Sequence, residues 1–398
     1  MKLFRLTNFN FNGKKVLVRV GFDMPIDGKG NITDDSRIRE ALPTLRYLIS
    51  KKAKVIVMTH HHRPDGKVVQ KLKVDKIAKR LSRLLRKNVL KLDHVIGKDV
   101  EEAVEAMKSG EIVMLENLRF YKQEEKNDSS FGKKIARLGD YYVNEAFSNC
   151  HREHASMVRV PKYIPGCLGL HAYDELIHLS LHGAKKPVYA IIGGVKLKTR
   201  VPMLERFSKI SKKVLLGGAM IFTFYKAMGF EIGKSLVDNE ELGIAKKVLR
   251  KYSHKIVLPQ DVLLSTDLKG KGKTKNVICG KIDKKSYGVD IGKESLLEFK
   301  EHLKNAKTIV WNGPMGIFEI PKFAKGTKGI ATMLSKLKAK TIIGGGDTST
   351  AIHQYKLTSK MSHVSTAGGA SLTLLEGKKL VGVQSLEKNY KIFKKQLK

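Results

Sequence analysis

Short apolar runs rich in Val, Ile and Leu alternate along the chain with longer segments whose apolar residues recur every three or four positions. The first pattern predicts buried strands, and the second predicts amphipathic helices. The runs expected as strands are Lys15–Val20, Lys54–Met58, Glu111–Leu115, Tyr141–Val143, Val188–Ile192, Val214–Leu216, Ile256–Leu258, Thr308–Trp311, Thr341–Ile343 and His363–Ser365. The helical patterns between them include Val74–Arg86, Phe131–Leu138, Leu204–Ile210, Asn239–Tyr252 and Lys293–Lys304. Such alternation is typical of βαβ units, so the sequence predicts an α/β fold with parallel sheets.

The length of the chain predicts more than one domain, because 398 residues are too many for a single compact core. We expect two Rossmann-like lobes, each a parallel sheet flanked by helices, over residues 1–170 and 187–380. Residues 171–186 are expected to join the lobes as a helix and hinge. The tail, 381–398, is a basic amphipathic segment that we expect to return to the first lobe.

Cysteine content and hydropathy indicate the cellular compartment of the protein. The chain has three cysteines, Cys150, Cys167 and Cys279, an odd count with no pairing suggested by their spacing. No apolar run approaches the roughly 20 residues that span a bilayer. The N-terminus lacks the long apolar stretch of a secretory signal. We therefore expect a cytoplasmic protein with reduced thiols and no membrane partner.

The charge is strongly positive, with 76 Lys and Arg against 38 Asp and Glu, a formal net charge of +38. Such a balance raises the hypothesis of a nucleic-acid partner, because clustered cations bind phosphate backbones. The alternative is a set of lysines spread over solvated helix faces. The basic residues recur throughout the chain and accompany no nucleic-acid-binding motif, so we expect no specific nucleic-acid binding.

Five strands of the second half are followed by glycine-rich turns, each before a helical pattern. They are Gly193–Lys196, Gly217–Met220, Asn312–Gly316, Gly344–Thr348 and Ala367–Gly369. Glycine lets the backbone approach a ligand, and helix N-termini attract phosphate. Ligands of parallel sheets bind beyond the carboxyl ends of the strands, so these turns predict a nucleotide site. Within them, Asp347 is a candidate partner for Mg²⁺, or a helix N-cap, and the two roles are compatible.

The first half carries basic residues at or just beyond its strand ends: Arg37, His60, Arg63, Arg119 and Arg152. Together they predict a pocket for a small anion with several charges. Two metal-site interpretations are less favoured. Three consecutive histidines, His60–His62, cannot all face one ion, and Cys150-His151 with His154 lacks a second ligand pair at zinc spacing.

Several of these segments together resemble phosphoglycerate kinase along nearly the whole chain. The motifs of the first half are Val18–Pro25, Arg37 with Leu42-Pro43-Thr44, Thr59–Pro64, Leu115–Phe120, Asn144–Phe147 and His151–Ser156. Those of the second half are Gly193–Lys196, Val310–Glu319, Gly344–Thr348 and Ser365–Leu372.

The resemblance implies a two-lobed, hinge-bending, monomeric enzyme of glycolysis, an ATP:3-phosphoglycerate 1-phosphotransferase. It would transfer a phosphoryl group reversibly from 1,3-bisphosphoglycerate to ADP, giving 3-phosphoglycerate and ATP with Mg²⁺. The first lobe would bind 3-phosphoglycerate through Gly21, Asp23, Arg37, His60, His61, His62, Arg63, Arg119 and Arg152. The second would bind the nucleotide through Lys196, Gly217, Gly218, Gly292, Asn312, Glu319, Gly345, Gly346, Asp347 and Thr348, with Asp347 holding Mg²⁺. The catalytic groups would be Arg37, Lys196, Arg200 and Gly368.

The chain departs from the family pattern at several of these positions. Gly21 stands where the family usually has aspartate, and Asp23 where it usually has asparagine. Residues two apart on a strand point to the same side, so Asp23 could supply the missing carboxylate. Arg200 replaces a usual lysine, Ala367 a usual glycine, and His61-His62 a usual Leu-Gly. These departures leave one alternative open, a catalytically impaired relative that acts as an anion- or nucleic-acid-binding protein.

Overall fold

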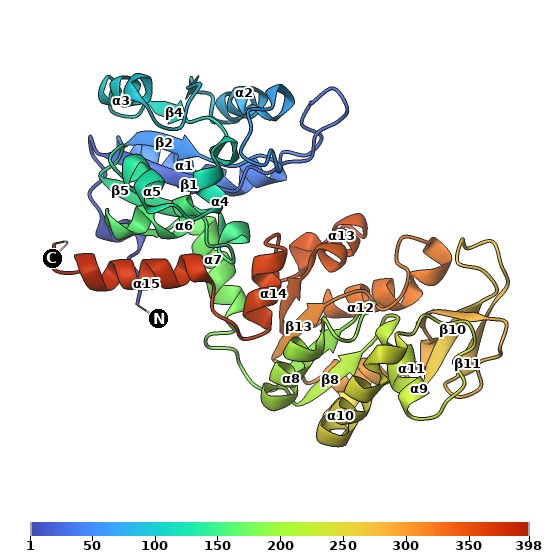
Figure 1. The fold of residues 1–398 in the computed structure, drawn as a ribbon. Coiled ribbons are helices and arrows are strands. Elements are labelled where there is room, and N and C mark those ends of the chain that lie inside the picture. The colour runs from blue at the N-terminus through green and yellow to red at the C-terminus, as the bar shows by residue number, and fades with distance from the viewer. Residues whose placement is uncertain (1, 397–398) are drawn as a thin grey trace. The chain divides into compact units, whose positions relative to one another are not determined.

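The computed structural model describes residues 2–396, and its contacts divide the chain into two units. Unit 1 comprises Met1–Ile177 together with Lys379–Lys398, and unit 2 comprises His178–Lys378. Each unit is built around its own sheet (Figure 1). Among residues 2–396, no helix combines the length and the apolar character that a membrane crossing requires.

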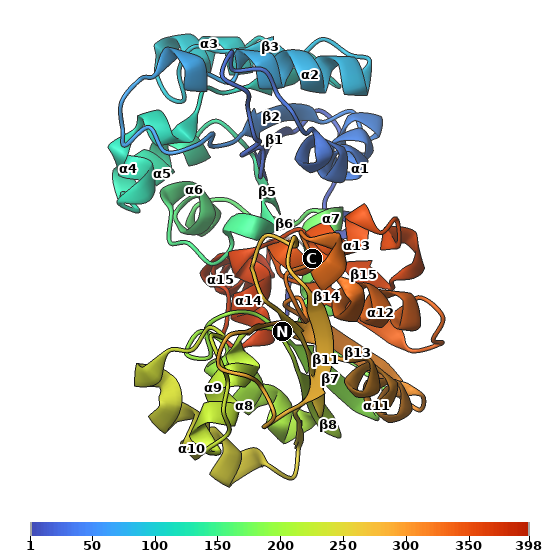
Figure 2. The same ribbon diagram turned by 90° about the vertical axis from the view of Figure 1, so that its right-hand side faces the viewer.

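Unit 1 has a six-stranded sheet in the order β3-β4-β2-β1-β5-β6, with every pair parallel. Its strands are β1 (Lys15–Val20), β2 (Lys54–Met58), β3 (Leu90–Lys91), β4 (Ile112–Met114), β5 (Tyr141–Glu145) and β6 (Gly166–Leu168). The apolar residues of β1 and β2 are buried because helices cover both faces of the sheet. Figure 2 shows α1 and α5 on opposite sides of these central strands.

Most helices of unit 1 bury one apolar stripe. They are α1 (Ser36–Ser50), α2 (Asp75–Leu85), α3 (Lys98–Glu105), α4 (Lys122–Glu125), α5 (Ser129–Ala136), α6 (Ala155–Val158), α7 (Leu170–Leu179) and α15 (Val381–Phe393). In α2, Ile77, Ala78 and Leu81 recur at helical spacing and face the core, whereas the other face carries lysine and arginine.

The C-terminal helix α15 belongs to unit 1. Asn389 anchors it: the side-chain Oδ1 accepts from the backbone N–H of Gly166 at 3.0 Å, and Nδ2 donates to the carbonyls of Pro161 at 2.5 Å and Ile164 at 2.8 Å. Ser385 adds a bond to the carbonyl of Val158. These bonds satisfy backbone groups at the end of the sheet, so the tail completes unit 1.

Unit 2 has a second six-stranded parallel sheet, in the order β15-β14-β13-β7-β8-β9. Its strands are β7 (Val188–Ile192), β8 (Lys213–Leu216), β9 (Ile256–Val257), β13 (Thr308–Asn312), β14 (Lys340–Gly344) and β15 (His363–Val364). Trp311 of β13 is fully buried at the centre, and its Nε1 donates to the carbonyl of Gly313 at 2.8 Å. The prediction of an α/β fold with two parallel sheets flanked by helices is confirmed.

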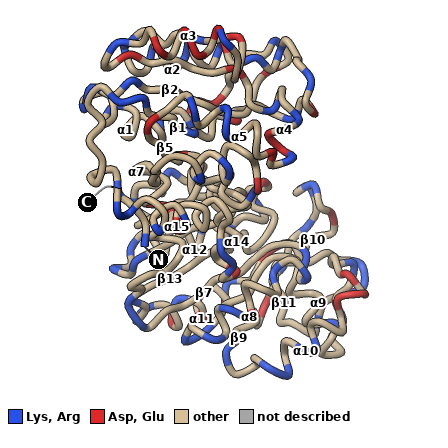
Figure 3. Tube along the Cα trace, turned by 60° about the vertical axis from the view of Figure 1, so that its left-hand side comes forward, with Lys and Arg blue, Asp and Glu red and all other residues tan. Residues whose placement is uncertain are grey.

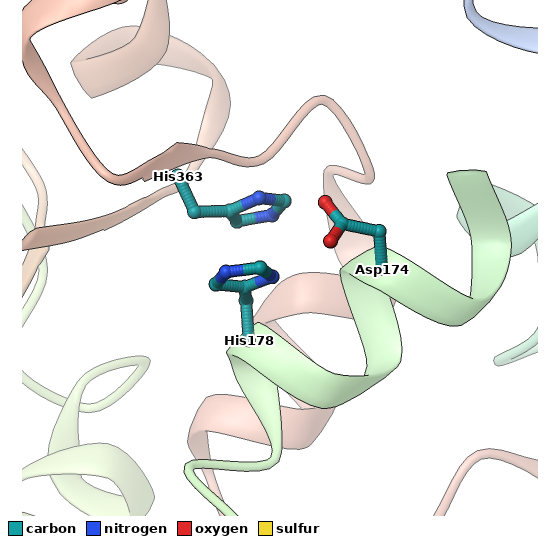
Figure 4. A group of neighbouring side chains, drawn as sticks. All are labelled: Asp174, His178 and His363. Carbon is teal, nitrogen blue, oxygen red and sulfur yellow. The ribbon is translucent and has the colours of Figure 1, made fainter. Parts of the chain in front are cut away.

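Helices cover both faces of this sheet as well, with α8 on one side and α11 and α12 on the other (Figure 2). The helices of unit 2 are α8 (Val201–Ile210), α9 (Met220–Ala227), α10 (Leu242–Tyr252), α11 (Lys293–Leu303), α12 (Lys325–Leu334), α13 (Gly346–Gln354) and α14 (Gly369–Leu375). The imidazole rings of His178, at the end of α7, and His363, on β15, stack with centroids 4.4 Å apart (Figure 4).

A three-stranded antiparallel sheet in unit 2 was missing from the sequence-based expectation. It consists of β10 (Asp261–Ser265), β11 (Thr274–Ile278) and β12 (Tyr287–Ile291), in the order β11-β10-β12. The pattern of β11 is polar and mostly exposed, which hides it from a search for apolar runs. This small sheet supplies one wall of the cavity described next.

Short 3₁₀ turns connect many of these elements. They are Leu6–Asn8, Gln70–Leu72, Leu118–Phe120, Phe147–Asn149, Val160–Lys162, Asn239–Glu241, Pro321–Phe323 and Thr358–Lys360. Two of them, Leu118–Phe120 after β4 and Phe147–Asn149 after β5, position side chains of the candidate site in unit 1.

Candidate active site

Unit 2 contains a cavity of about 730 Å³ at the carboxyl ends of its central strands. Polar groups line one part of it: Lys196, Thr199, Arg200 and Asp347. Apolar groups line another part, among them Phe222, Leu236, Leu268, Val289, Ile317 and Phe318. A cavity with charged groups in one part and apolar walls in another suits a ligand that has phosphates and a flat ring.

The cavity depends on glycines where three turns meet. A Cβ on Gly218 would collide with the backbone of Gly194, and one on Gly193 would collide with the carbonyl of Pro314. Gly218 also has a positive φ of 70°, a conformation that favours glycine. The turns after β7, β8 and β13 therefore pack backbone against backbone, which brings main-chain groups close to the space for a ligand.

Arg200 is the most constrained cation at the polar part. Its Nη1 donates to Oδ1 of Asn312 at 2.7 Å, and Nδ2 of Asn312 donates to the carbonyl of Gly344 at 2.8 Å. Burial lowers the pKa of the guanidinium, and the charges of Asp347 and Glu376 oppose that shift. Arginine keeps its charge in such a site, so Arg200 presents a fixed cation to the cavity.

Lys196 is a second cation in the cavity, and it is exposed. It lies in the turn after β7, and the next residue, Leu197, donates its backbone N–H to Glu241 at 2.8 Å. Among residues 2–396, no acceptor is recorded for its ammonium group. The bond from Leu197 to Glu241 therefore fixes the turn, while the amine of Lys196 stays available to an anion.

Asp347 lies in the first turn of α13, exposed and on the cavity wall. The next residue, Thr348, is fully buried, and its Oγ1 accepts from the backbone N–H of Gly313 at 2.7 Å. Thr348 therefore ties α13 to the turn after β13, and Asp347 offers a free carboxylate oxygen of the kind that Mg²⁺ prefers.

The cavity brings together some of the sequence-predicted nucleotide residues but not all. Lys196, Gly218, Glu319 and Asp347 line it, together with Arg200, which was predicted as a catalytic group. The remaining ones are not among the residues that line it: Gly217, Gly292, Asn312, Gly345, Gly346 and Thr348. Asn312 is 1% exposed and accepts a hydrogen bond from Arg200. Gly345 caps α13 with φ 93°, and a Cβ there would crowd Nδ2 of Asn312.

Gly292 does not line the cavity in this structure, and its part in nucleotide binding stays a prediction. Gly292 is the N-cap of α11, its N–H donates to the carbonyl of Asp261 at 2.9 Å, and a Cβ would strike the carboxylate of Asp261. Gly288, four residues earlier on β12, lines the cavity instead and lies against the ring of Phe222. The sequence offered no way to choose between the two glycines, because β12 was not predicted.

Gly368, predicted as catalytic, precedes α14 with φ 52° and has open space where a Cβ would stand. Its carbonyl accepts from the hydroxyl of Ser371 at 2.7 Å. The residue starts the helix, as expected from the glycine-rich turn.

In unit 1 the predicted basic residues gather at the carboxyl ends of neighbouring strands. The loops after β1, β2, β4 and β5 carry Asp23, His60–Arg63, Arg119 and Arg152 respectively. Arg37, in the first turn of α1, donates from Nη1 to the carbonyl of Asp23 at 2.5 Å. Arg63 is exposed, and Arg152 is half-buried with Nε 3.3 Å from His151 Nε2.

Asp23 and His60 form a coupled pair. Oδ1 of Asp23 accepts the backbone N–H of His62 at 2.9 Å, and Oδ2 lies 3.5 Å from Nε2 of His60. Burial alone would raise the pKa of Asp23, but the bonds from His60 and His62 and the charge of Arg37 hold it below its usual value. Burial lowers the pKa of His60 to about 3, with help from the charges of Arg19 and Arg119, so the ring is neutral at pH 7.

The other two histidines take separate partners. Nε2 of His61 lies 3.3 Å from the carbonyl of Met24, and burial lowers the pKa of its ring. The carbonyl of His62 accepts from Nη1 of Arg119 at 2.8 Å, and Nε of Arg119 lies 3.1 Å from Glu125. Burial thus lowers the pKa of the His60 and His61 rings, and the backbone carbonyl of His62 holds Arg119.

Two groups of residues in this site were not found from the sequence. Arg19 of β1 is fully buried, with Nε donating to Ser156 at 3.0 Å and Nη2 3.1 Å from Nδ1 of His60. The sequence did contain an indication of Arg19, since it is a charged residue inside an otherwise apolar strand. Ser148 and Asn149, in the turn after β5, lie beside Gly21.

Lysine and arginine elsewhere are distributed over helices and loops of both units (Figure 3). Basic residues predominate on α2 and acidic ones on α3, and basic residues recur across unit 2 (Figure 3). This distribution favours the interpretation of +38 as a diffuse surface property.

Comparison with known proteins identifies the family. The sequence model described as phosphoglycerate kinase matches residues 6–378. A phosphoglycerate kinase of Prochlorococcus marinus is 47% identical over 384 residues, 94% of this chain and 96% of the relative, and one of Dictyoglomus turgidum is 45% identical over 388 residues, 96% and 98%. The solved phosphoglycerate kinase of Coxiella burnetii has a TM-score of 0.91 at 34% identity, covering 97% of this chain and 99% of that one. The chain therefore belongs to the phosphoglycerate kinase family.

Proposed function

We propose that this chain is an ATP:3-phosphoglycerate 1-phosphotransferase, which transfers a phosphoryl group reversibly between 1,3-bisphosphoglycerate and ADP. The observation that carries the proposal is the cavity in unit 2. Lys196, Arg200 and Asp347 line its polar part, and apolar side chains line the rest. A separate arginine cluster in unit 1 offers the second anion site that such a transfer needs.

The unit 2 cavity is proposed to hold Mg²⁺-nucleotide. Lys196 and Arg200 would neutralise the phosphates, and Glu319 at the wall would accept from the ribose hydroxyls. The exposed carboxylate of Asp347 fits a magnesium ion that keeps its waters and the nucleotide phosphates as its other ligands. The base would lie among the apolar residues, near Phe222 and Gly288.

The unit 1 cluster is proposed to hold 3-phosphoglycerate. Arg37, Arg63, Arg119 and Arg152 supply planar guanidinium groups, which bind phosphate and carboxylate in pairs of hydrogen bonds. His60 and His61 are neutral, so they would act as hydrogen-bonding groups rather than as charges.

The chemistry that these groups support is charge neutralisation and positioning. In the direction of ATP formation the acceptor is already a phosphate oxygen of ADP, so no general base is needed. Fixed donors aimed at the transferred phosphoryl group stabilise its transition state without reorganising. Arg200, held by Asn312, is the clearest such donor in this chain.

We also propose a cytoplasmic, monomeric enzyme of glycolysis and gluconeogenesis. The three cysteines support the location, since all are free thiols, as is usual in a reducing compartment. Burial raises the pKa of Cys150 to about 12, which leaves it unreactive at neutral pH.

One second candidate has a specific observation in its favour. Gly21 lacks the side chain that the family usually places there, so a relative that binds both ligands without turnover is the alternative. The assay that separates the two couples ATP formation from ADP and 1,3-bisphosphoglycerate to a chromogenic reporter. Turnover in the range of about 1–100 s⁻¹ that is typical of kinases supports the enzyme. Binding of both ligands without turnover supports the alternative.

A further inference from the structure

The space beside Gly21 is bounded by two polar side chains from another loop. A Cβ built on Gly21 would lie 3.2 Å from Oγ of Ser148 and 3.8 Å from Oδ1 of Asn149. Both residues belong to the 3₁₀ turn that follows β5. A side chain at position 21 would therefore start in tight contact with the hydroxyl of Ser148 and compete with it for space.

Asp23 does not fill this space. Its carboxylate bonds to the N–H of His62 and faces His60, and both of these residues follow β2. In the sheet, β1 lies between β2 and β5, so Asp23 is directed to one neighbour while Gly21 opens toward the other. In this structure the carboxylate of Asp23 therefore does not point into the space beside Gly21.

Ser148 and Asn149 are held firmly enough to act as a binding group. Asn149 is 4% exposed, its backbone N–H donates to the carbonyl of Ala146 at 2.9 Å, and its Oδ1 lies 3.5 Å from Oγ of Ser148. Its own carbonyl accepts from the N–H of Arg152 at 2.9 Å. Ser148 is half-buried, so its hydroxyl is oriented by the turn and still reachable.

We propose that Ser148, supported by Asn149, binds the three-carbon acid beside Gly21 and sets the specificity of unit 1 for it. This inference rests on the proposed function. A serine hydroxyl can accept from a substrate hydroxyl and can also donate to a substrate carboxylate. A carboxylate in the same place could only accept. With glycine at position 21, the carboxylate usual there is absent. The hydroxyl of Ser148, in the turn after the neighbouring strand β5, would take its place as the binding group.

The test is a double-mutant cycle on the full-length enzyme. Ser148→Ala should raise KM for 3-phosphoglycerate about three- to tenfold, the usual effect of one lost hydrogen bond, and leave KM for ATP unchanged. Gly21→Asp alone should also raise KM, because its side chain meets Oγ of Ser148. Combining Gly21→Asp with Ser148→Gly should recover most of the affinity, and this non-additivity is the signature of two groups sharing one place.

Two further variants serve as controls. Ser148→Thr keeps the hydroxyl and should keep KM within about twofold, which also covers the case in which Ser148→Ala fails to fold. Ser129→Ala removes an exposed hydroxyl of α5, bonded to Tyr163, and should change neither KM.

Calorimetric titration of 3-phosphoglycerate separates failure of this inference from failure of the proposed function. If the wild-type chain binds but does not turn over, the same cycle is scored in Kd, and Ser148 is tested without the reaction. The inference is overturned if Ser148→Ala leaves both KM and Kd unchanged, if the two substitutions are additive, or if the wild-type chain does not bind 3-phosphoglycerate.

Discussion

Arg200 and Asn312, 112 residues apart in the sequence, are joined by a hydrogen bond of 2.7 Å from Nη1 to Oδ1. Asn312 bonds in turn to the carbonyl of Gly344, so the cation is fixed to the ends of β13 and β14. A lysine in the same place would offer a single point charge without this planar, directed contact. Residues at the ends of β13 and β14 thus hold the arginine that replaces the lysine usual in the family.

Arg200→Ala should lower kcat by about 10²–10³, because it removes a preorganised donor at the phosphate part of the cavity. Asn312→Ala should lower kcat less, since it frees the guanidinium without removing it. Steady-state kinetics at saturating substrates measure both. Equal losses in the two variants would contradict the view that Asn312 acts by positioning Arg200.

Lys196→Ala should lower kcat by a similar factor and leave the melting temperature unchanged, because the ammonium is exposed and no acceptor is recorded for it in the part of the chain that the structure describes. Lys198→Ala is the matched control, an exposed lysine two residues along that does not line the cavity. Near-normal turnover of Lys196→Ala would contradict the proposal that Lys196 binds the nucleotide phosphates.

Arg63→Ala and Arg119→Ala should mainly raise KM for 3-phosphoglycerate and leave KM for ATP unchanged. Arg119 is held by His62 and Glu125, so its removal should also lower stability, whereas exposed Arg63 should not. Arg137→Ala, an exposed arginine in the segment between α5 and β5, is the control. A selective rise in KM for ATP would show that the two substrates have been assigned to the wrong units.

Stability should fall as the pH drops from about 6.5 toward 3, in part because of His60. Its pKa is about 3 in the folded chain and 6.5 in the reference state, so over this range the unfolded chain binds a proton that the folded chain does not. His60→Gln should flatten the dependence of the melting temperature on pH over this window. An unchanged pH profile in this variant would mean that His60 titrates normally.

Binding to duplex DNA should be weak and should vanish near physiological salt, because the basic residues are spread over both units (Figure 3). A fluorescence anisotropy titration at several salt concentrations measures this. Sequence-selective binding that persists at physiological salt would favour the nucleic-acid alternative.

The elements with strong local patterns were predictable from the sequence. The apolar runs Lys15–Val20 and Lys54–Met58 match β1 and β2 at both ends, because buried parallel strands are continuous apolar runs. The mostly exposed β11 was not predictable, since its pairing with β10 rather than its own pattern makes it a strand.

The composition of the sites was predictable only in part. The glycine-rich turns located the cavity of unit 2, but the burial of Asn312 behind Arg200 depends on contacts between distant segments. The same holds for Ser148, whose place beside Gly21 follows from the neighbouring positions of β1 and β5 in the sheet. Local sequence patterns do not indicate which distant residues come into contact.

The most direct test of the assignment is a progress curve of ATP formation by the purified chain from ADP, Mg²⁺ and 1,3-bisphosphoglycerate. We expect one ATP for each acyl phosphate consumed, at a rate that Lys196→Ala lowers by about 10²–10³. No ATP above the uncatalysed rate, with both ligands shown to bind, would contradict the assignment of this chain as an active phosphotransferase.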